Sequence, residues 1–173
     1  MKSRNGQINE IIKCGKDPVY FMNRYLKIQH PLRGLIPFKT FPFQDDCVQD
    51  FNDHRFNIIL KSRQLGLSTL VAAYAVWQAT FYKEKNILII ATKLAVAQNF
   101  IRKVKTYLKS MPKWLLVPQI TANNKQQVEF SNGSQIKAVP TSEDAGRSEA
   151  LSLLIVDEAA FVRNFDELWM GLY

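Results

Sequence analysis

Cysteine and histidine are scarce in this chain, with two of each among 173 residues. Cys14 and Cys47 lie far apart, and neither belongs to a CxxC pattern or stands near a pair of histidines. This spacing argues against a disulfide framework or a zinc site, and it fits a reducing, cytosolic setting. We interpret the isolated His30 and His54 as surface or packing residues rather than metal ligands.

Long apolar runs are absent as well. No stretch approaches the roughly 18 consecutive apolar residues that a membrane-spanning helix needs. Residues 2–7 are polar and basic with no apolar segment behind them, so no signal peptide is predicted. There are no internal repeats and no low-complexity tract. The sequence therefore predicts a protein without a membrane partner.

The residues that are present describe a basic globular protein. Hydrophobic residues make up 47% of the chain and charged residues 22%, which are ordinary values for a folded domain. A length of 173 residues suits one domain better than two. The net charge of +8 favours an acidic partner, with nucleic acid or nucleotide first and anionic membrane second.

The first part of the chain predicts a segment, residues 1–43, that wraps over the core. Residues 1–17 suggest either a frayed terminus or a small docking helix. Asp17 followed by Pro18 predicts a helix start, since aspartate caps helices and proline suits the first helical position. Residues 30–43 contain three prolines and are expected to be extended or turning. A helix is predicted at 44–51.

The rest of the chain alternates between strand and helix patterns. The predicted elements are a strand at 57–60, a helix at 70–82, strands at 87–91 and 151–156, a helix at 93–109, a hairpin of 127–130 with 134–139, and a helix start after 159. Uninterrupted apolar strands are typical of a parallel sheet covered on both faces. The order predicts an α/β fold with a mostly parallel sheet, flanked by helices, and one hairpin.

The helix at 93–109 has one apolar face and one basic face. The basic residues are Lys93, Arg102, Lys103, Lys105 and Lys109. Such a face either contacts solvent alone or binds nucleic acid, and the sequence does not decide between the two.

The segment at 61–69 has the pattern of a phosphate-binding loop. It consists of Lys61, Ser62, Arg63, Gln64, Leu65, Gly66, Leu67, Ser68 and Thr69. It lies between a predicted strand and a predicted helix, where backbone N–H groups can point at a phosphate. On the template G-x-x-x-x-G-K-[ST], Gly66 and Ser68 match, whereas Lys61 replaces the first glycine and Leu67 replaces the lysine. A flexible Lys61 side chain could supply the missing charge from the other end of the loop.

The pair Asp157 and Glu158 follows the predicted strand at 151–156. Ligands of an open parallel sheet bind beyond the carboxyl ends of its strands, which places this pair and the loop at one rim. A carboxylate there can hold Mg²⁺ opposite a loop hydroxyl, so we assign Asp157 and Ser68 to the metal. The adjacent Glu158 can orient or deprotonate the attacking water.

Residues 61–66 with Ser68 and Thr69, and residues 154–161, together resemble the large terminase subunit of tailed bacteriophages. The resemblance runs from about residue 18 to the end and covers the amino-terminal part of the family's ATPase domain. It implies a P-loop ATPase of the additional-strand (ASCE) type that uses ATP and Mg²⁺. Most members carry lysine where Leu67 stands, but some branches, including the lambda-like one, carry it at the position of Lys61.

The same resemblance implies partners and further site residues. Gln44 matches a glutamine that reads the adenine base, and Arg147 matches an arginine that reaches a neighbouring subunit's nucleotide, with Arg63 as the other candidate for that role. The implied partners are double-stranded DNA, a homo-oligomeric ring, the portal protein and the small terminase subunit. The implied location is the host cytoplasm, transiently at the procapsid portal.

The sequence therefore predicts the ATPase motor part of a terminase, which drives DNA into a procapsid. A helicase-like DNA-dependent ATPase and a non-hydrolysing nucleotide- or DNA-binding fragment are the alternatives. Because the family's coupling motif and nuclease domain are expected beyond Tyr173, we expect a partial protein, incomplete at its C-terminus. Such a chain should have weak ATPase activity at most and no nuclease activity.

Overall fold

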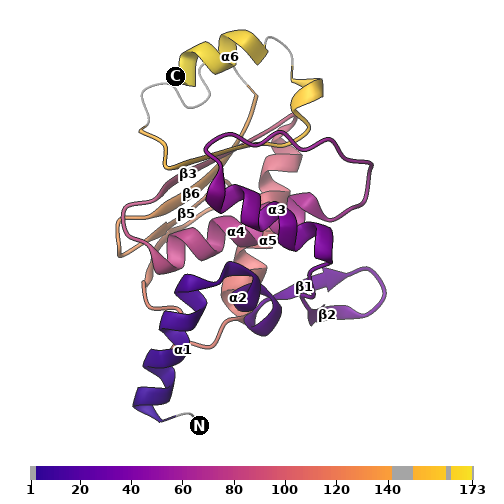
Figure 1. Ribbon diagram of the computed structural model, residues 1–173. Helices are drawn as coiled ribbons and strands as arrows, with labels where there is room; N and C mark the ends of the chain where they lie inside the picture. The colour runs from indigo at the N-terminus through magenta and orange to yellow at the C-terminus, as the bar shows by residue number, and fades with distance from the viewer. Residues whose placement is uncertain (1–2, 142–149, 163–164, 173) are drawn as a thin grey trace.

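The computed structural model describes residues 3–141, 150–162 and 165–172 and has a mixed α/β architecture (Figure 1). Its centre is a five-stranded sheet in the order β4-β5-β6-β3-β7. The strands are β3 (Asn86–Ala91), β4 (Ile120–Asn123), β5 (Gln127–Phe130), β6 (Gln135–Pro140) and β7 (Leu153–Val156). The β6-β3-β7 part is parallel and the β4-β5-β6 part is antiparallel. The prediction of a mostly parallel sheet is therefore wrong in detail, because the hairpin and the unpredicted β4 extend one edge.

Strand β3 is the centre of the core. Its residues from Ile87 to Ala91 are fully buried, as the apolar run at 87–91 predicts. Alternate side chains of a strand point to opposite faces of the sheet. Ile87 and Ile89 belong to the main core, whereas Leu88 and Ile90 pack in a second, smaller cluster with Val162 and Leu168.

Helices α4 (Leu67–Phe81) and α5 (Leu94–Ser110) pack against each other and against the sheet. Helix α4 is buried nearly all round, because α2 (Pro18–Tyr25) and α3 (Pro42–Asp53) also contact it. Helix α6 (Phe165–Leu172) lies at the top of Figure 1, after the short 3-10 helix η1 (Ala159–Phe161), and supplies Leu168 to the smaller cluster. The helices predicted at 44–51, 70–82 and 93–109 are confirmed with slightly shifted ends.

The N-terminal segment is folded rather than frayed. Helix α1 (Arg4–Lys16) docks on α4, since the indole nitrogen of Trp77 donates a hydrogen bond of 2.8 Å to the carbonyl oxygen of Cys14. The predicted start of α2 is confirmed, because the Asp17 carboxylate accepts from the Tyr20 backbone N–H at 2.8 Å and Pro18 takes the first position. Of the two alternatives for this terminus, the docking helix is correct over the described residues from Ser3 onward.

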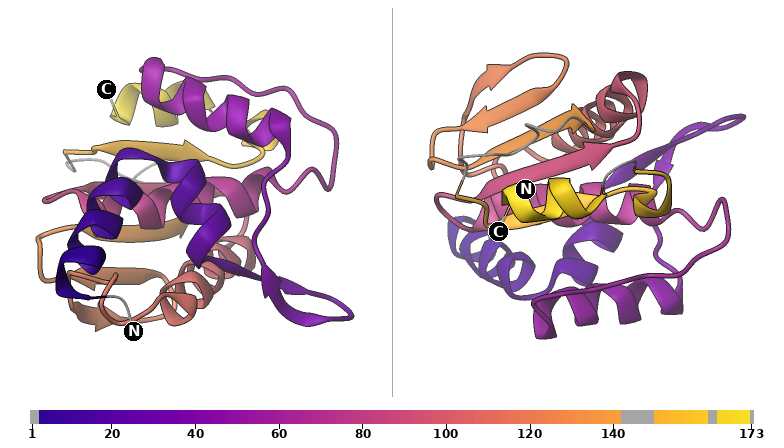
Figure 2. Two further views of the ribbon diagram at one scale, coloured as in Figure 1. Left: turned by 60° about the horizontal axis from the view of Figure 1, so that its bottom comes forward. Right: turned by 90° about the horizontal axis from the view of Figure 1, so that it is seen from above.

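Antiparallel hairpins connect several of these elements. The strands β1 (Lys27–His30) and β2 (Gly34–Pro37) form a hairpin that both views of Figure 2 show projecting from the body of the fold. The sequence predicted an extended, turning segment there but not the pairing. The β5–β6 hairpin is confirmed, with Gly133 at a φ of +80° in its turn. The Asn132 amide nitrogen donates to the carbonyl oxygens of Ala79 and Tyr82, both at 2.9 Å, which attaches this turn to the end of α4.

The strand predicted at residues 57–60 is absent. The segment has no regular secondary structure, Ile58 and Leu60 are fully exposed, and no strand of the described chain pairs with it. An apolar run predicts burial, but a strand also needs a partner, and among the described residues the five strands of the sheet pair only with one another. The strand predicted at 151–156 is present as β7, yet it is only half-buried because, within the described residues, it forms an edge of the sheet.

No helix within the described residues is both long enough and apolar enough to cross a membrane.

Candidate functional site

The loop before α4 has two residues in the left-handed region of backbone conformation. Gln64 and Gly66 have positive φ angles of 64° and 72°. Gly66 is the N-cap of α4, and no side chain caps the helix. Its carbonyl oxygen accepts hydrogen bonds from the N–H groups of Thr69 and Leu70 at 3.0 and 2.9 Å. The first N–H groups of α4 are thus left to face a ligand, at the positive end of the helix dipole.

Ser68 and Asp157 meet across 89 positions of sequence. The Ser68 hydroxyl donates to both oxygens of the Asp157 carboxylate, at 3.2 and 3.0 Å. Asp157 follows β7, and its N–H donates to the carbonyl oxygen of Ile90 at 3.0 Å, so the sheet holds it in place. The structure therefore brings the loop and the acidic pair to one rim, and a hydroxyl beside a carboxylate is a donor set that Mg²⁺ accepts.

Glu158 stands next to this pair in an unusual conformation. Its φ of 55° and ψ of 44° are left-handed, a region that residues other than glycine seldom adopt. The side chain is exposed, and within the described part of the chain it makes no hydrogen bond or ion pair. Residues held in such sparsely populated conformations cluster at functional sites, so the conformation of Glu158 motivates a functional hypothesis for it.

Gln44 lies beneath the loop and is 2% exposed. Its side-chain nitrogen donates to the Leu65 carbonyl oxygen at 2.9 Å, and its side-chain oxygen accepts from the Phe41 N–H at 3.2 Å. Both ends of the amide are therefore bonded within the protein. The adenine-reading role implied for Gln44 stays a prediction, and the structure adds that Gln44 supports the loop from α3.

A substitution at Gly66 should disturb both the backbone and this support. Alanine at φ +72° costs roughly 1–2 kcal/mol, and the added Cβ would lie 3.0 Å from the Gln44 side-chain nitrogen. We expect Gly66→Ala to lower the free energy of unfolding by about that amount in urea denaturation. Gly15→Ala is the control, because a Cβ at Gly15 meets only ordinary contacts and alanine favours a helix. Equal stability of the two variants would contradict the conformation assigned to Gly66.

The other loop residues divide into exposed and buried ones. Lys61, Ser62, Arg63, Gln64 and Leu65 are exposed, and Lys61 and Arg63 have no ion pair among the described residues. Leu67 is 6% exposed and packs in the main core. The position that usually carries lysine therefore points inward here. Arg147 lies outside the described residues.

Helix α5 contributes Tyr107 to the site and brings Lys103 within the electrostatic influence of Asp157, and the sequence predicted neither. The Tyr107 hydroxyl donates to the Thr69 carbonyl oxygen at 2.9 Å. Lys103, one turn earlier, is half-buried, and burial lowers the pKa of its ammonium while the nearby Asp157 opposes that shift. The sequence placed Lys103 on the basic face. The signal that could have revealed it is its spacing of three and four residues from Phe100 and Tyr107, at the border of the apolar stripe.

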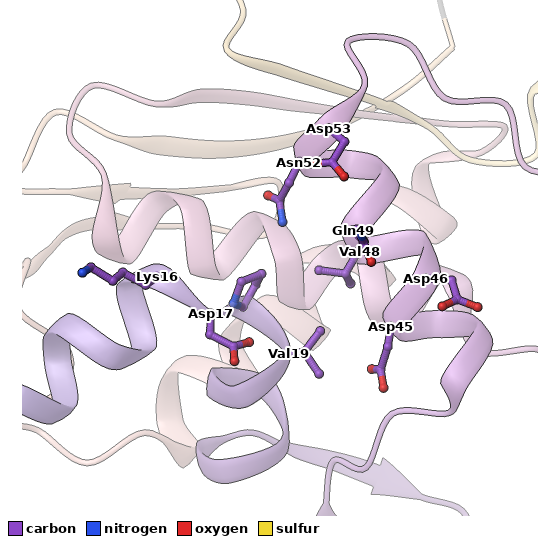
Figure 3. A pocket seen from close by; sticks show the side chains of 10 residues that line it. Lys16, Asp17, Val19, Asp45, Asp46, Val48, Gln49, Asn52 and Asp53 are labelled. Atoms are coloured by element: carbon purple, nitrogen blue, oxygen red, sulfur yellow. The ribbon is translucent and has the colours of Figure 1, made fainter.

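A separate cleft of about 430 Å³ lies between α3 and the junction of α1 with α2 (Figure 3). Its lining includes four carboxylates, Asp17, Asp45, Asp46 and Asp53, and none of the predicted site residues. Negative charge repels phosphate, so this cleft does not suit a nucleotide. Within the described residues, no group of three or more His, Cys, Asp or Glu side chains is arranged to hold a metal ion by itself.

The fold is similar to one solved structure in particular. The crystal structure of the HK97 bacteriophage large terminase superposes with a TM-score of 0.71 at 20% sequence identity. The match covers 91% of this chain and 34% of that one, so the chain spans about a third of the length of this relative. At this level of identity the comparison establishes the fold.

The sequence itself identifies the family. Residues 58–170 match the family model described as terminase large subunit, T4likevirus-type, N-terminal. The chain therefore belongs to the terminase large-subunit family and corresponds to its N-terminal part. The resemblance drawn from the two motifs is confirmed, and the matched range contains both of them.

Proposed function

We propose that this chain is the ATPase motor part of a terminase large subunit, and that it hydrolyses ATP to drive packaging of double-stranded DNA into a procapsid. The observation that carries the proposal is the direct contact between Ser68 and Asp157. Two motifs chosen for phosphate and metal chemistry meet there, in a chain whose family packages DNA. The fold is accordingly proposed to be a P-loop ATPase of the ASCE type.

Ser68 and Asp157 would hold Mg²⁺, since both offer the hard oxygen ligands that this ion prefers. A bound Mg²⁺ would neutralise negative charge on the phosphates of a nucleotide held there. The N–H groups at the start of α4, which no side chain caps, would bind the phosphates beside it. In this arrangement the Ser68 hydroxyl and the Asp157 carboxylate would orient the phosphate end of ATP. The loop at 61–69 would fix its position.

Glu158 is assigned to the attacking water. Its exposed carboxylate is adjacent to Asp157 and makes no bond within the described residues, so it can accept a proton from water. Arg63 in the loop, or Arg147 from a neighbouring subunit, would stabilise the charge that develops on the transferred phosphoryl group. A homo-oligomeric ring, the portal protein and the small terminase subunit are the partners proposed from the family.

Lys61 is proposed to supply the cation that the buried Leu67 cannot. We expect Lys61→Ala to lower steady-state ATP turnover by about tenfold or more, because a charged partner of a phosphate contributes roughly that much. Turnover is measured with Mg²⁺, with EDTA and with added double-stranded DNA. Lys125→Ala is the control, since Lys125 is also exposed but lies between β4 and β5, at the far edge of the sheet. Normal turnover by Lys61→Ala would disprove the displaced-lysine hypothesis.

A helicase-like DNA-dependent ATPase is the second candidate. The basic face of α5 supports it, because Lys93, Arg102 and Lys109 are exposed and available to a nucleic acid. Transport of DNA into proheads distinguishes the packaging motor, whereas strand separation in a duplex-unwinding assay would favour the helicase.

A further inference from the structure

The candidate nucleotide site has little fixed positive charge on its loop. Leu67 is buried in the core, and Lys61 and Arg63 extend into solvent without a partner among the described residues. A flexible lysine must lose side-chain entropy to bind a phosphate, and solvent screens its charge. A cation already held in a half-buried position near Ser68 and Asp157 would lose less side-chain entropy on binding a phosphate, and solvent would screen its charge less.

Helix α5 brings such a cation to the site. Its residue Tyr107 reaches the first turn of α4, where its hydroxyl bonds to the carbonyl oxygen of Thr69. Tyr107 is itself buried and its ring stacks on Phe38 at 6.2 Å, so this part of α5 is fixed in the core. Residues four apart lie on the same face of a helix. Lys103 therefore stands one turn from the contact with Thr69.

The surroundings of Lys103 restrict where its ammonium can go. The side chain is half-buried, and its nitrogen lies 5.2 Å from the centre of the Phe100 ring. It has no ion pair within the part of the chain that the structure describes. Burial disfavours the charged form and lowers the pKa of the ammonium, while among the described residues the carboxylate of Asp157 favours the charged form. A partly desolvated ammonium with no ion pair of its own is suited to receive an anion.

We propose that Lys103 is a phosphate-binding residue of the candidate nucleotide site, where it holds a positive charge beside Asp157 and Ser68. This inference rests on the proposed function, since it assigns a further ligand-binding residue to the same site. The proposal gives Lys103 a different role from the exposed lysines of α5. Lys109, on the same helix, remains a residue of the solvent-facing basic surface.

Binding of ATP with Mg²⁺ to the 173-residue chain, measured by titration calorimetry, tests the proposal. Lys103→Met keeps the length and apolar character of the side chain but removes the charge. We expect it to weaken ATP binding by about 10- to 100-fold, as for a charge-assisted hydrogen bond, and to weaken AMP binding much less. Lys103→Arg should retain ATP binding within a few fold, and Lys109→Met should match the wild type.

Thermal unfolding shows whether Lys103→Met is folded. Removing a partly desolvated charge is expected to leave the melting temperature equal or higher, so weaker binding would not come from lost structure. If Lys103→Met fails to fold, Lys103→Gln replaces it in the same titration. An equal loss for ATP and AMP would overturn the proposal, because it would indicate a structural role.

The result for Ser68→Ala separates this inference from the proposed function. If Ser68→Ala weakens ATP binding but Lys103→Met binds as well as the wild type or better, Lys103 only neutralises Asp157 and the inference is wrong. If the wild type does not bind ATP, or if Ser68→Ala and Lys103→Met both bind like the wild type, the proposed nucleotide site is wrong and the inference with it.

Discussion

Glu158→Gln is expected to lower ATP turnover by about 10²- to 10⁴-fold while leaving ATP binding close to the wild-type value. The range is that of a residue acting as a general base, and glutamine keeps the size of the side chain but cannot accept the proton. The left-handed φ of 55° should persist, because glutamine and glutamate have the same steric demands at the backbone. Turnover and titration calorimetry on the same preparation separate chemistry from binding.

The control for this experiment is Glu84→Gln. Glu84 is also an exposed glutamate with a positive φ, of 57°, but it precedes β3 and therefore lies at the opposite end of the sheet from Glu158. The Glu84→Gln variant should turn over ATP at the wild-type rate. If Glu158→Gln retained full turnover, the water-activating role would have to pass to another group. If it lost binding to the same extent as turnover, Glu158 would be a ligand-binding residue instead.

Ile89→Ala is expected to lower the free energy of unfolding by about 2–5 kcal/mol. Ile89 is fully buried at the middle of β3, where it lies opposite Ala138 of β6 and Ile155 of β7. Truncation leaves a cavity between the sheet and the helices, and close packing on all sides limits how far the neighbours can relax. Urea denaturation followed by circular dichroism measures the loss.

Ile58→Ala is the matched comparison in that experiment. The apolar run at 58–60 and the run at 87–91 look alike in sequence, but Ile58 is fully exposed. Its replacement should leave the unfolding midpoint unchanged within error. A loss comparable to that of Ile89→Ala would show that Ile58 is buried in solution, and would favour the strand that the sequence predicted there.

Local pattern was sufficient for much of the fold. The amphipathic spacing of α5, the Asn-Gly turn between β5 and β6, and the aspartate–proline start of α2 each depend on interactions within a few residues. The loop at 61–69 and the acidic pair after β7 were also predictable from local sequence, because their residue types are typical of phosphate and metal binding. That these two would share a rim followed from the rule that ligands bind at the carboxyl ends of parallel strands.

Tertiary structure decided the rest, because burial and pairing depend on partners distant in sequence. Composition alone could not tell that residues 57–60 lack a neighbouring strand, or that β7 is half-buried at an edge. Nor could it reveal that Gln44 supports the loop and that Leu67 fills the core. Lys103 has the same local pattern as the exposed lysines of its helix. Only the packing of α5 against α4 half-buries Lys103, because that packing decides which part of the basic face loses contact with water.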